Sequence, residues 1–177
     1  MYQKISIKDL TRSSIFTALI IVLSYVTIPL PLSPVPVTGQ SLAIMLAASI
    51  LTAKQTILSI LTYIFLGIAG LPIFAGGTNG IAAILGPRGG YVVGFLIGGI
   101  IINLLKGKNY RPARLIVANT LGGIIVLYIC GVIWLSFVTG IEIYEAIISG
   151  ALPFLPGDIF KAIITAFLSP QIVKRIN

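Results

Sequence analysis

Two ionisable side chains, Asp158 and Lys161, lie inside the last long apolar stretch of the sequence and are its strongest candidates for chemistry. Their spacing of three places both on one face of a helix. Charges inside such a stretch are costly and indicate a functional site by default. Asp158 also has a structural explanation, because Pro156 favours a helix start there and a first turn stabilises a carboxylate. Lys161 would then be only its partner, yet a cation near that positive helix end calls for a further anion.

Few other side chains in the sequence could support catalysis. There is no histidine, one cysteine and a total of four acidic residues. Histidine is the commonest metal ligand and general base, so neither a metal site nor acid-base chemistry is expected. Cys130 lies in an apolar run and is expected to fill the core. The sequence therefore predicts no enzyme, no catalytic residue, no metal and no cofactor.

The composition predicts a membrane protein. Of the 177 residues, 57% are hydrophobic and 9% are charged, and the mean hydropathy is +1.09. So few polar residues cannot cover a water-facing surface. A net charge of +8 would suggest a nucleic-acid partner in a soluble protein, but here it is better explained by membrane orientation. We expect one all-α integral membrane domain over residues 1–177 and no nucleic-acid partner.

Six transmembrane helices are expected, since a span needs about 20 mostly apolar residues. The first apolar stretch lacks a signal-peptide cleavage site, so it is expected to be a retained helix. Lys54 and Gln55 should mark a tight turn between the second and third helices. The alternative of five helices would require one helix over 37–74, which is too long for a bilayer. The expected spans are 13–30, 37–53, 56–74, 90–105, 115–140 and 156–173.

The positive charges test this arrangement, because cytoplasmic loops are enriched in Lys and Arg. Ten of the twelve cations fall in segments that six spans place on one side, which leaves Arg88 on the other side and Lys161 inside a span. Both termini are therefore expected to be cytoplasmic, in a multi-pass protein of the cell membrane. The ten cations are Lys4, Lys8, Arg12, Lys54, Lys106, Lys108, Arg111, Arg114, Lys174 and Arg175.

The three connections on the other side are unusually apolar. Residues 29–40 contain four prolines, which favour a stiff, extended, polyproline-like segment. Residues 70–90 are rich in glycine and carry one charge, and residues 139–155 are typical of a short amphipathic piece at the membrane surface. Non-helical backbone at membrane depth persists only where protein buries it or it lines a cavity. The connections therefore predict a covered pocket, although short turns in contact with lipid are an alternative.

Two strips of small residues are typical of close helix packing. Gly90, Gly94 and Gly98 recur every fourth residue, and we expect them to pack against a neighbouring helix. Ser14 and Ala18 form a second strip, with Thr11 one turn earlier. Spacing does not decide whether this second strip packs internally or docks another membrane subunit.

Four motifs in order along the chain carry a family resemblance. They are PVPVTGQ at 34–40, GLPIFAGG at 70–77, GPRGGY at 86–91 with Gly94 and Phe95, and PGDIFK at 156–161. With these motifs the chain resembles the BioY family, the biotin-specific S components of energy-coupling factor (ECF) vitamin transporters. The resemblance implies a six-helix subunit that captures biotin from outside. It also implies partners, namely an energising membrane subunit and two ATPases, which alone use ATP.

The resemblance also assigns roles to the charged pair and the glycine-rich connection. Asp158 would accept the N–H groups of the ureido ring of biotin. Lys161 would donate to the ureido carbonyl or to the carboxylate, in charge-assisted bonds that burial strengthens. Thr78 and Asn79 would close the polar end of the site.

Four further residues complete the expected site. Thr38 and Gln40 would lie in the rigid first connection, and Tyr91 would provide an aromatic wall. Arg88 departs from the family pattern, so its role as a carboxylate clamp depends on its charge alone. The strip of Ser14 and Ala18 resembles the family's contact surface for the energising subunit.

Three alternatives remain open at this point. A subunit or carrier for another vitamin or small solute would share the architecture but need other polar contacts, and binding of biotin compared with thiamin and riboflavin discriminates the two. An intramembrane enzyme would need a convergent acid-base set, which one Asp–Lys pair does not supply. A purely structural membrane protein is the third alternative, and it is poorly suited to a buried charge pair.

Overall fold

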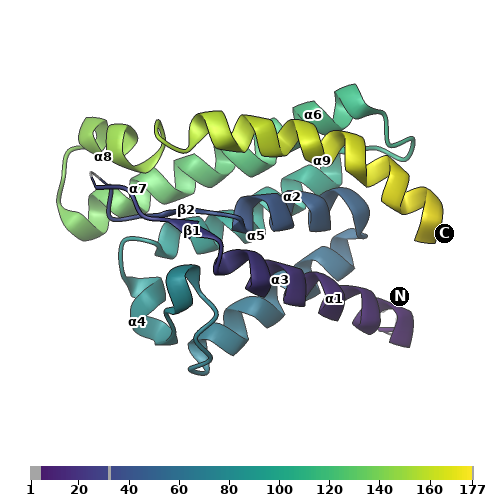
Figure 1. Ribbon diagram of the computed structural model, residues 1–177, viewed down its shortest axis with the longest axis horizontal. Helices are drawn as coiled ribbons and strands as arrows, with labels where there is room; N and C mark the ends of the chain where they lie inside the picture. The colour runs from purple at the N-terminus through teal and green to yellow at the C-terminus, as the bar shows by residue number, and fades with distance from the viewer. Residues whose placement is uncertain (1–4, 32, 177) are drawn as a thin grey trace.

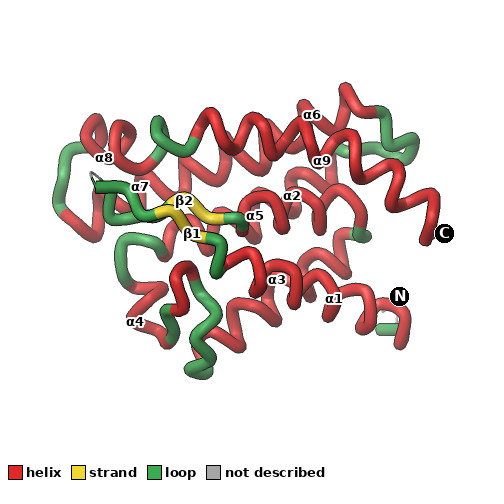
Figure 2. Tube along the Cα trace, viewed as in Figure 1, coloured by secondary structure: helices red, strands yellow, loops and turns green. Residues whose placement is uncertain are grey.

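Helices make up most of the chain in the computed structural model, which describes residues 5–31 and 33–176 (Figures 1 and 2). Two short strands, β1 (Thr27–Ile28) and β2 (Val37–Thr38), form an antiparallel ribbon. The α-helices are α1 (Ile7–Ser24), α2 (Gln40–Ile50), α3 (Ala53–Ile68), α4 (Gly80–Leu85), α5 (Gly89–Leu105), α6 (Pro112–Thr120), α7 (Leu127–Thr139), α8 (Ile143–Gly150) and α9 (Leu155–Ile176). A 3-10 turn, η1, covers Ala75–Gly77, and a π-helical segment, η2 (Leu121–Val126), joins α6 to α7.

Helix α2 lies at the centre of the bundle, with α9 above it and α1 and α3 below it in the view of Figure 1. It packs against α1, α5 and α9, and ten of its eleven residues are buried. Its alanines and serines allow neighbouring helices to approach closely. The position of α2 therefore sets the distances between the other helices.

The expected break between the second and third helices is present, three residues earlier than predicted. Leu51 has an extended backbone and ends α2. Thr52 and Gln55 then form a capping box at the start of α3, in which each side chain accepts a hydrogen bond from the other residue's backbone N–H. Lys54 and Gln55 lie in the first turn of α3 rather than in the turn itself. The alternative of one helix over 37–74 is wrong.

The remaining helix bounds differ from the predicted spans mainly for the first and third helices. Helix α1 begins before residue 13 because Ser6 and Asp9 form a capping box, and it ends before the ribbon strand β1. Helix α3 ends at Ile68, shortly before Gly70, whose φ of +105° is incompatible with a helix. The predicted spans 90–105, 115–140 and 156–173 agree with helical segments to within three residues at each end.

By length and apolarity alone, one helix in the described part of the chain is able to cross a membrane, the continuous 28-residue segment Pro112–Thr139. A second is counted when α8 and α9, bent by 55° at their junction, are taken together. Helices α2, α3 and α5 are apolar but shorter. A predominantly helical fold is confirmed, while the number of spans and the side of the termini stay predictions.

The three apolar connections are folded rather than open. The proline-rich connection turns back on itself, since Thr27 lies opposite Thr38 and Ile28 opposite Val37 in the ribbon. The expectation of one stiff, extended, polyproline-like segment over 29–40 is therefore wrong, because the chain reverses direction within it. Leu32 lies outside the described residues. The glycine-rich connection contains η1 and α4, and the third connection contains α8, as its amphipathic pattern indicated.

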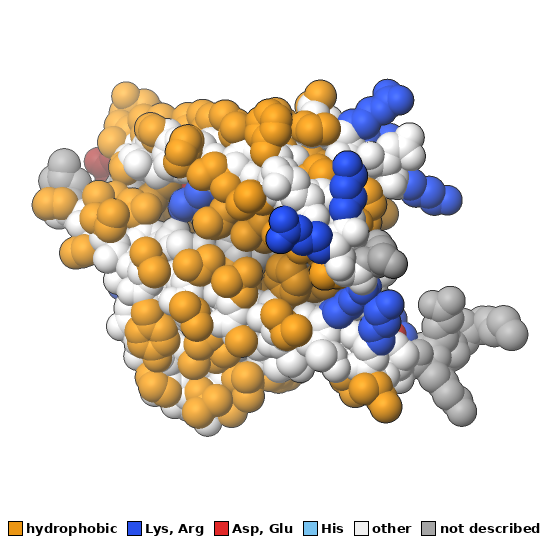
Figure 3. Space-filling model, turned by 45° about the vertical axis from the view of Figure 1, so that its right-hand side comes forward, with side chains coloured by type: hydrophobic (Ala, Val, Ile, Leu, Met, Phe, Trp, Pro, Cys, Tyr) orange, Lys and Arg blue, Asp and Glu red, His pale blue; other side chains and the backbone are white. Residues whose placement is uncertain are grey.

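Cations gather at the end of the bundle where both termini lie, and most of the remaining face in Figure 3 is hydrophobic. Lys4 lies outside the described residues. Lys106, expected in a solvated connection, is 8% exposed. Its ammonium donates to the carbonyl of Ala48 at 2.8 Å and to that of Leu51. A cation at the end of α2 stabilises its unpaired carbonyl groups and the negative end of its dipole.

The glycine strip of α5 packs against η2 and α7, as expected. A β-carbon on Gly98 would lie 2.2 Å from the carbonyl oxygen of Gly122, and one on Gly90 would lie 2.4 Å from that of Cys130. Both distances are far below van der Waals contact. These glycines therefore set how closely α5 approaches the helix opposite.

We expect Gly98→Ala to lower the free energy of unfolding by about 1–3 kcal/mol, the usual cost of overpacking. The midpoint of thermal unfolding in detergent measures the effect. Gly157→Ala is the matched control, because a β-carbon there meets no atom within 4 Å. Equal midpoints for both variants would contradict the close approach at Gly98.

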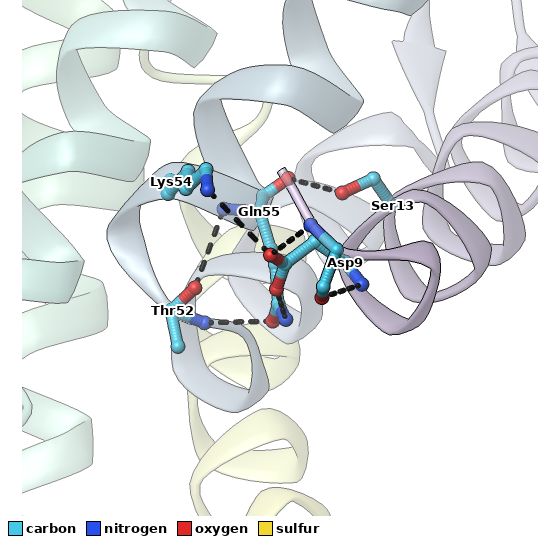
Figure 4. Close-up of polar contacts among 6 residues, drawn as sticks. Asp9, Ser13, Thr52, Lys54 and Gln55 are labelled. Atoms are coloured by element: carbon cyan, nitrogen blue, oxygen red, sulfur yellow. Dashed lines mark hydrogen bonds and ion pairs between the residues drawn. The ribbon is translucent and has the colours of Figure 1, made fainter. Parts of the chain in front are cut away.

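The first turns of α1 and α3 are joined at the terminal end of the bundle (Figure 4). The amide of Gln55 donates to Oδ1 of Asp9 at 2.7 Å, and Nζ of Lys54 lies 3.6 Å from Oδ2. The hydroxyl of Ser13 donates to the carbonyl of Gln55 at 3.1 Å. These bonds connect two helices that are separated along the chain by α2.

The hydrogen bond from Gln55 and those from Ser6 lower the pKa of Asp9 from its usual 3.8 to about 2. Because the folded value lies below the unfolded one, the carboxylate stabilises the fold fully above about pH 4, and this contribution is lost as the pH falls toward 2. A titration of the Asp9 carboxyl followed by carbon-13 NMR should give a midpoint near 2. A midpoint near 4, or one unchanged by Gln55→Ala, would show that the joint does not form.

Candidate functional site

A cavity lies in the half of the molecule away from the chain termini, between β2, α2, α5, α7 and α9. It contains about 680 Å³ of space outside the protein atoms, its open mouth included, which is within the usual range for small-molecule sites. Most of its wall is apolar or aromatic, with a few converging polar groups. The lining residues are Val35, Pro36, Val37, Thr38, Gln40, Ser41, Tyr63, Phe74, Ala75, Thr78, Ala83, Arg88, Tyr91, Val92, Phe95, Leu127, Tyr128, Phe154, Asp158 and Lys161.

The charged pair of α9 faces this cavity. Nζ of Lys161 lies 2.7 Å from Oδ1 of Asp158, and the two side chains are 16% and 6% exposed. Oδ1 also accepts the hydroxyl of Ser41 at 2.7 Å, and Oδ2 accepts the hydroxyl of Tyr128 at 2.7 Å. The carboxylate thus connects α9 to α2 and α7. Removing such a charge from water is costly unless several partners compensate it, as these three do.

The ammonium of Lys161 uses all three of its donors within the protein. Besides Asp158, it donates to the carbonyl of Thr38 at 2.8 Å and to Oγ of Ser41 at 2.9 Å. Ser41 therefore accepts from the ammonium while it donates to the carboxylate. The further anion expected for Lys161 is replaced here by a backbone carbonyl of the ribbon. A ligand carbonyl that reaches Lys161 would exchange with one of these neutral acceptors.

Polar and aromatic groups form the rest of the wall. The amide of Gln40 donates to the hydroxyl of Tyr63, whose ring meets that of Phe74 edge-on at 5.4 Å. The hydroxyl of Tyr91 donates to the carbonyl of Gly150 at 2.7 Å. Because their polar ends are bonded, these residues are held in fixed orientations and present ring surfaces to the cavity.

The glycine-rich connection contributes a cation. Nη1 of Arg88, at the start of α5, donates to the carbonyl of Ala75 at 2.9 Å, and Thr78 donates to the same carbonyl at 3.2 Å. In the described part of the chain, no carboxylate lies within 4 Å of Arg88. Arg88 thus lines the cavity without a carboxylate beside it in the part of the chain that the structure describes.

The structure brings together seven of the eight predicted site residues. Asn79 is the exception. Its amide donates to the carbonyl of Gly70 at 2.8 Å, and it does not line the cavity. The seven that do are Asp158, Lys161, Thr78, Gln40, Thr38, Tyr91 and Arg88.

Sequence reasoning missed two partners of the charged pair. Ser41 follows Gln40 directly, and a hydroxyl at the start of an otherwise apolar helix is a weak signal. Tyr128 lies among aliphatic residues, where a buried phenol needs a hydrogen-bond partner. In the described part of the chain, no group of three His, Cys, Asp or Glu side chains is placed to hold a metal.

Known proteins with similar sequences belong to the family whose motifs this chain contains. The model of the BioY family matches residues 1–177. A protein of Lactococcus lactis subsp. cremoris named biotin transporter BioY2 is 36% identical over 176 residues, which cover 99% of this chain and 95% of that protein. Biotin transporter BioY of Thermotoga maritima is 36% identical over 167 residues, which cover 94% and 96% of the two chains.

One solved structure has a fold closely similar to that of this chain. It is the S-component for biotin from an ECF-type ABC transporter, with a TM-score of 0.86 and 35% sequence identity. The match covers 98% of this chain and 95% of that one. The arrangement of helices found here is therefore that of a known transporter component.

Proposed function

Because this chain belongs to the BioY family, we propose that it is a membrane protein that captures biotin and serves as the substrate-binding subunit of an ECF-type transporter. The single observation that carries this proposal is the charged cluster of Asp158, Lys161 and Ser41, which faces an otherwise apolar cavity. Relatives of this chain are named biotin transporters, and a relative of solved structure is an S-component for biotin.

The ureido ring of biotin suits the charged pair in the wall of this cavity. The ureido ring has two N–H donors and a carbonyl acceptor. A carboxylate has about four acceptor positions, and three of those on Asp158 are used, so one remains for a ureido N–H. Lys161 donates to the ureido carbonyl in exchange for a neutral acceptor.

The other parts of biotin meet other walls. The rings of Tyr91, Phe95 and Phe154 line the cavity and suit the apolar fused ring. Arg88 attracts the carboxylate tail. Thr38, Gln40 and Thr78 supply polar edges between these regions. Asn79 is directed at Gly70, and it would reach biotin only after a change in the connection.

We also propose six membrane spans with both termini in the cytoplasm. The gathering of Lys and Arg at the terminal end supports this orientation (Figure 3). Large apolar side chains exposed on several helices support a lipid-facing belt, among them Phe65, Leu104, Phe137 and Phe160. Helix α2 rises only roughly 16 Å, about half of the apolar thickness, so the ribbon and cavity would occupy the rest of its depth.

An energising membrane subunit and two ATPases are the proposed partners. The sequence contains no G-x-x-x-x-G-K-[ST] motif, so ATP would be used by those partners. Ser14 and Ala18 are exposed on α1, with Thr11 one turn before them. We propose that this face contacts the energising membrane subunit.

Asp158→Asn and Lys161→Ala should each weaken biotin binding at least roughly tenfold, about 1.4 kcal/mol, because a desolvated ligand group loses its charged partner. Equilibrium binding to the purified variants measures this. Glu145→Gln is the matched control, since it removes a carboxylate charge from an exposed residue of α8. Affinity near wild type in both folded variants would contradict the proposed site.

A further inference from the structure

Helix α1 is held on α3 by three polar residues that recur every fourth position. Asp9 accepts from Gln55, and Ser13 donates to the carbonyl of the same residue. One turn further, the hydroxyl of Thr17 lies 3.0 Å from the carbonyl oxygen of Ser59. Contacts on three successive turns fix the rotation of α1 about its own axis as well as its position.

The first of these contacts joins two capping boxes. Asp9 forms a box with Ser6 at the start of α1, and Gln55 forms one with Thr52 at the start of α3. The bond between Asp9 and Gln55 links the two boxes side chain to side chain, as Figure 4 shows. Either residue therefore stabilises the start of its own helix and the joint between the helices. A surface ion pair with Lys54 adds little by comparison.

The joint also sets the direction of the adjacent face of α1, which carries Ser14 and Ala18. Ser13 and Thr17 are buried, whereas Ser14 and Ala18 are exposed. Because neighbouring residues lie about 100° apart around a helix, a rotation of α1 by that angle would turn Ser14 and Ala18 toward α3. The hydrogen-bonded residues thus determine that the small residues point outward.

We propose that Asp9 and Gln55 are positioning residues for assembly with the energising membrane subunit, because their joint holds the small-residue face of α1 in the orientation that this partner binds. This inference rests on the proposed function, in which that face is the contact. Helix ends without tertiary contacts fray. Association with a frayed helix must also order it, which costs affinity. A joint formed before binding removes that cost.

The test exchanges the carboxylate of Asp9 and the amide of Gln55 between the two positions. Gln55→Glu keeps an acceptor for the capping box of α3 but places a second carboxylate beside that of Asp9, and the two repel each other. Combining it with Asp9→Asn restores an amide-to-carboxylate hydrogen bond with the roles reversed. We expect Gln55→Glu to weaken association with the co-expressed energising subunit at least roughly tenfold, and the double variant to recover most of the loss.

Biotin binding by the isolated variants separates positioning from folding. A merely structural role would lower biotin affinity together with assembly, whereas a positioning role leaves biotin affinity unchanged while assembly is weakened. Should Gln55→Glu fail to bind biotin, Gln55→Ala replaces it, since it removes the joint without repulsion. Unaltered association, or a loss that the double variant does not recover, would overturn the inference.

A further variant, Ala18→Trp, tests the contact face itself. Loss of association with Ala18→Trp, together with unaltered association for Gln55→Glu, would leave the proposed function standing and refute the positioning role. Association that Ala18→Trp does not weaken would refute the contact face, and the inference with it.

Discussion

A carboxylate and an ammonium 2.7 Å apart, enclosed by apolar helices, form the interaction on which the rest of the structure depends. Such a pair is stable away from water only where further hydrogen bonds compensate both charges. Here Ser41 of α2, Tyr128 of α7 and the Thr38 carbonyl of β2 supply them. The elements β2, α2 and α7 all precede α9 in sequence by many residues or by another helix, and they must therefore converge on its start. The same convergence forms the cavity, so the polar contacts that stabilise the fold also shape the proposed binding site.

Close helix packing makes this convergence possible. The glycines of α5 let its backbone approach η2 and α7 at distances that exclude a β-carbon. The small residues of α2 let it lie buried among α1, α5 and α9. At the terminal end, Lys106 binds carbonyl groups at the end of α2, and Gln55 joins α3 to α1. The two ends of the bundle are thus held by different polar groups, and the cavity occupies one of them.

Properties that repeat along one helix could be predicted from the sequence, while those that depend on contacts between distant segments could not. The helix at 156–173 and the strip from Gly90 to Gly98 follow from local periodicity. Asp158 was recognisable because a charge in an apolar helix needs a reason. Its partner Ser41 lies 117 residues away, and no local pattern connects the two. The prolines of 29–40 indicated a stiff segment, but ribbon pairing determined its path.

We propose that the cluster around Asp158 and Lys161 recognises a ureido ring. This proposal is tested most directly by titrating the purified wild-type protein with biotin, thiamin and riboflavin in equilibrium binding experiments. We predict saturable binding of biotin and no comparable binding of the other two vitamins, because neither presents two N–H donors beside one carbonyl on a small apolar bicycle. Absence of biotin binding by folded protein, or tighter binding of thiamin or riboflavin, would show that the cluster does not recognise a ureido ring.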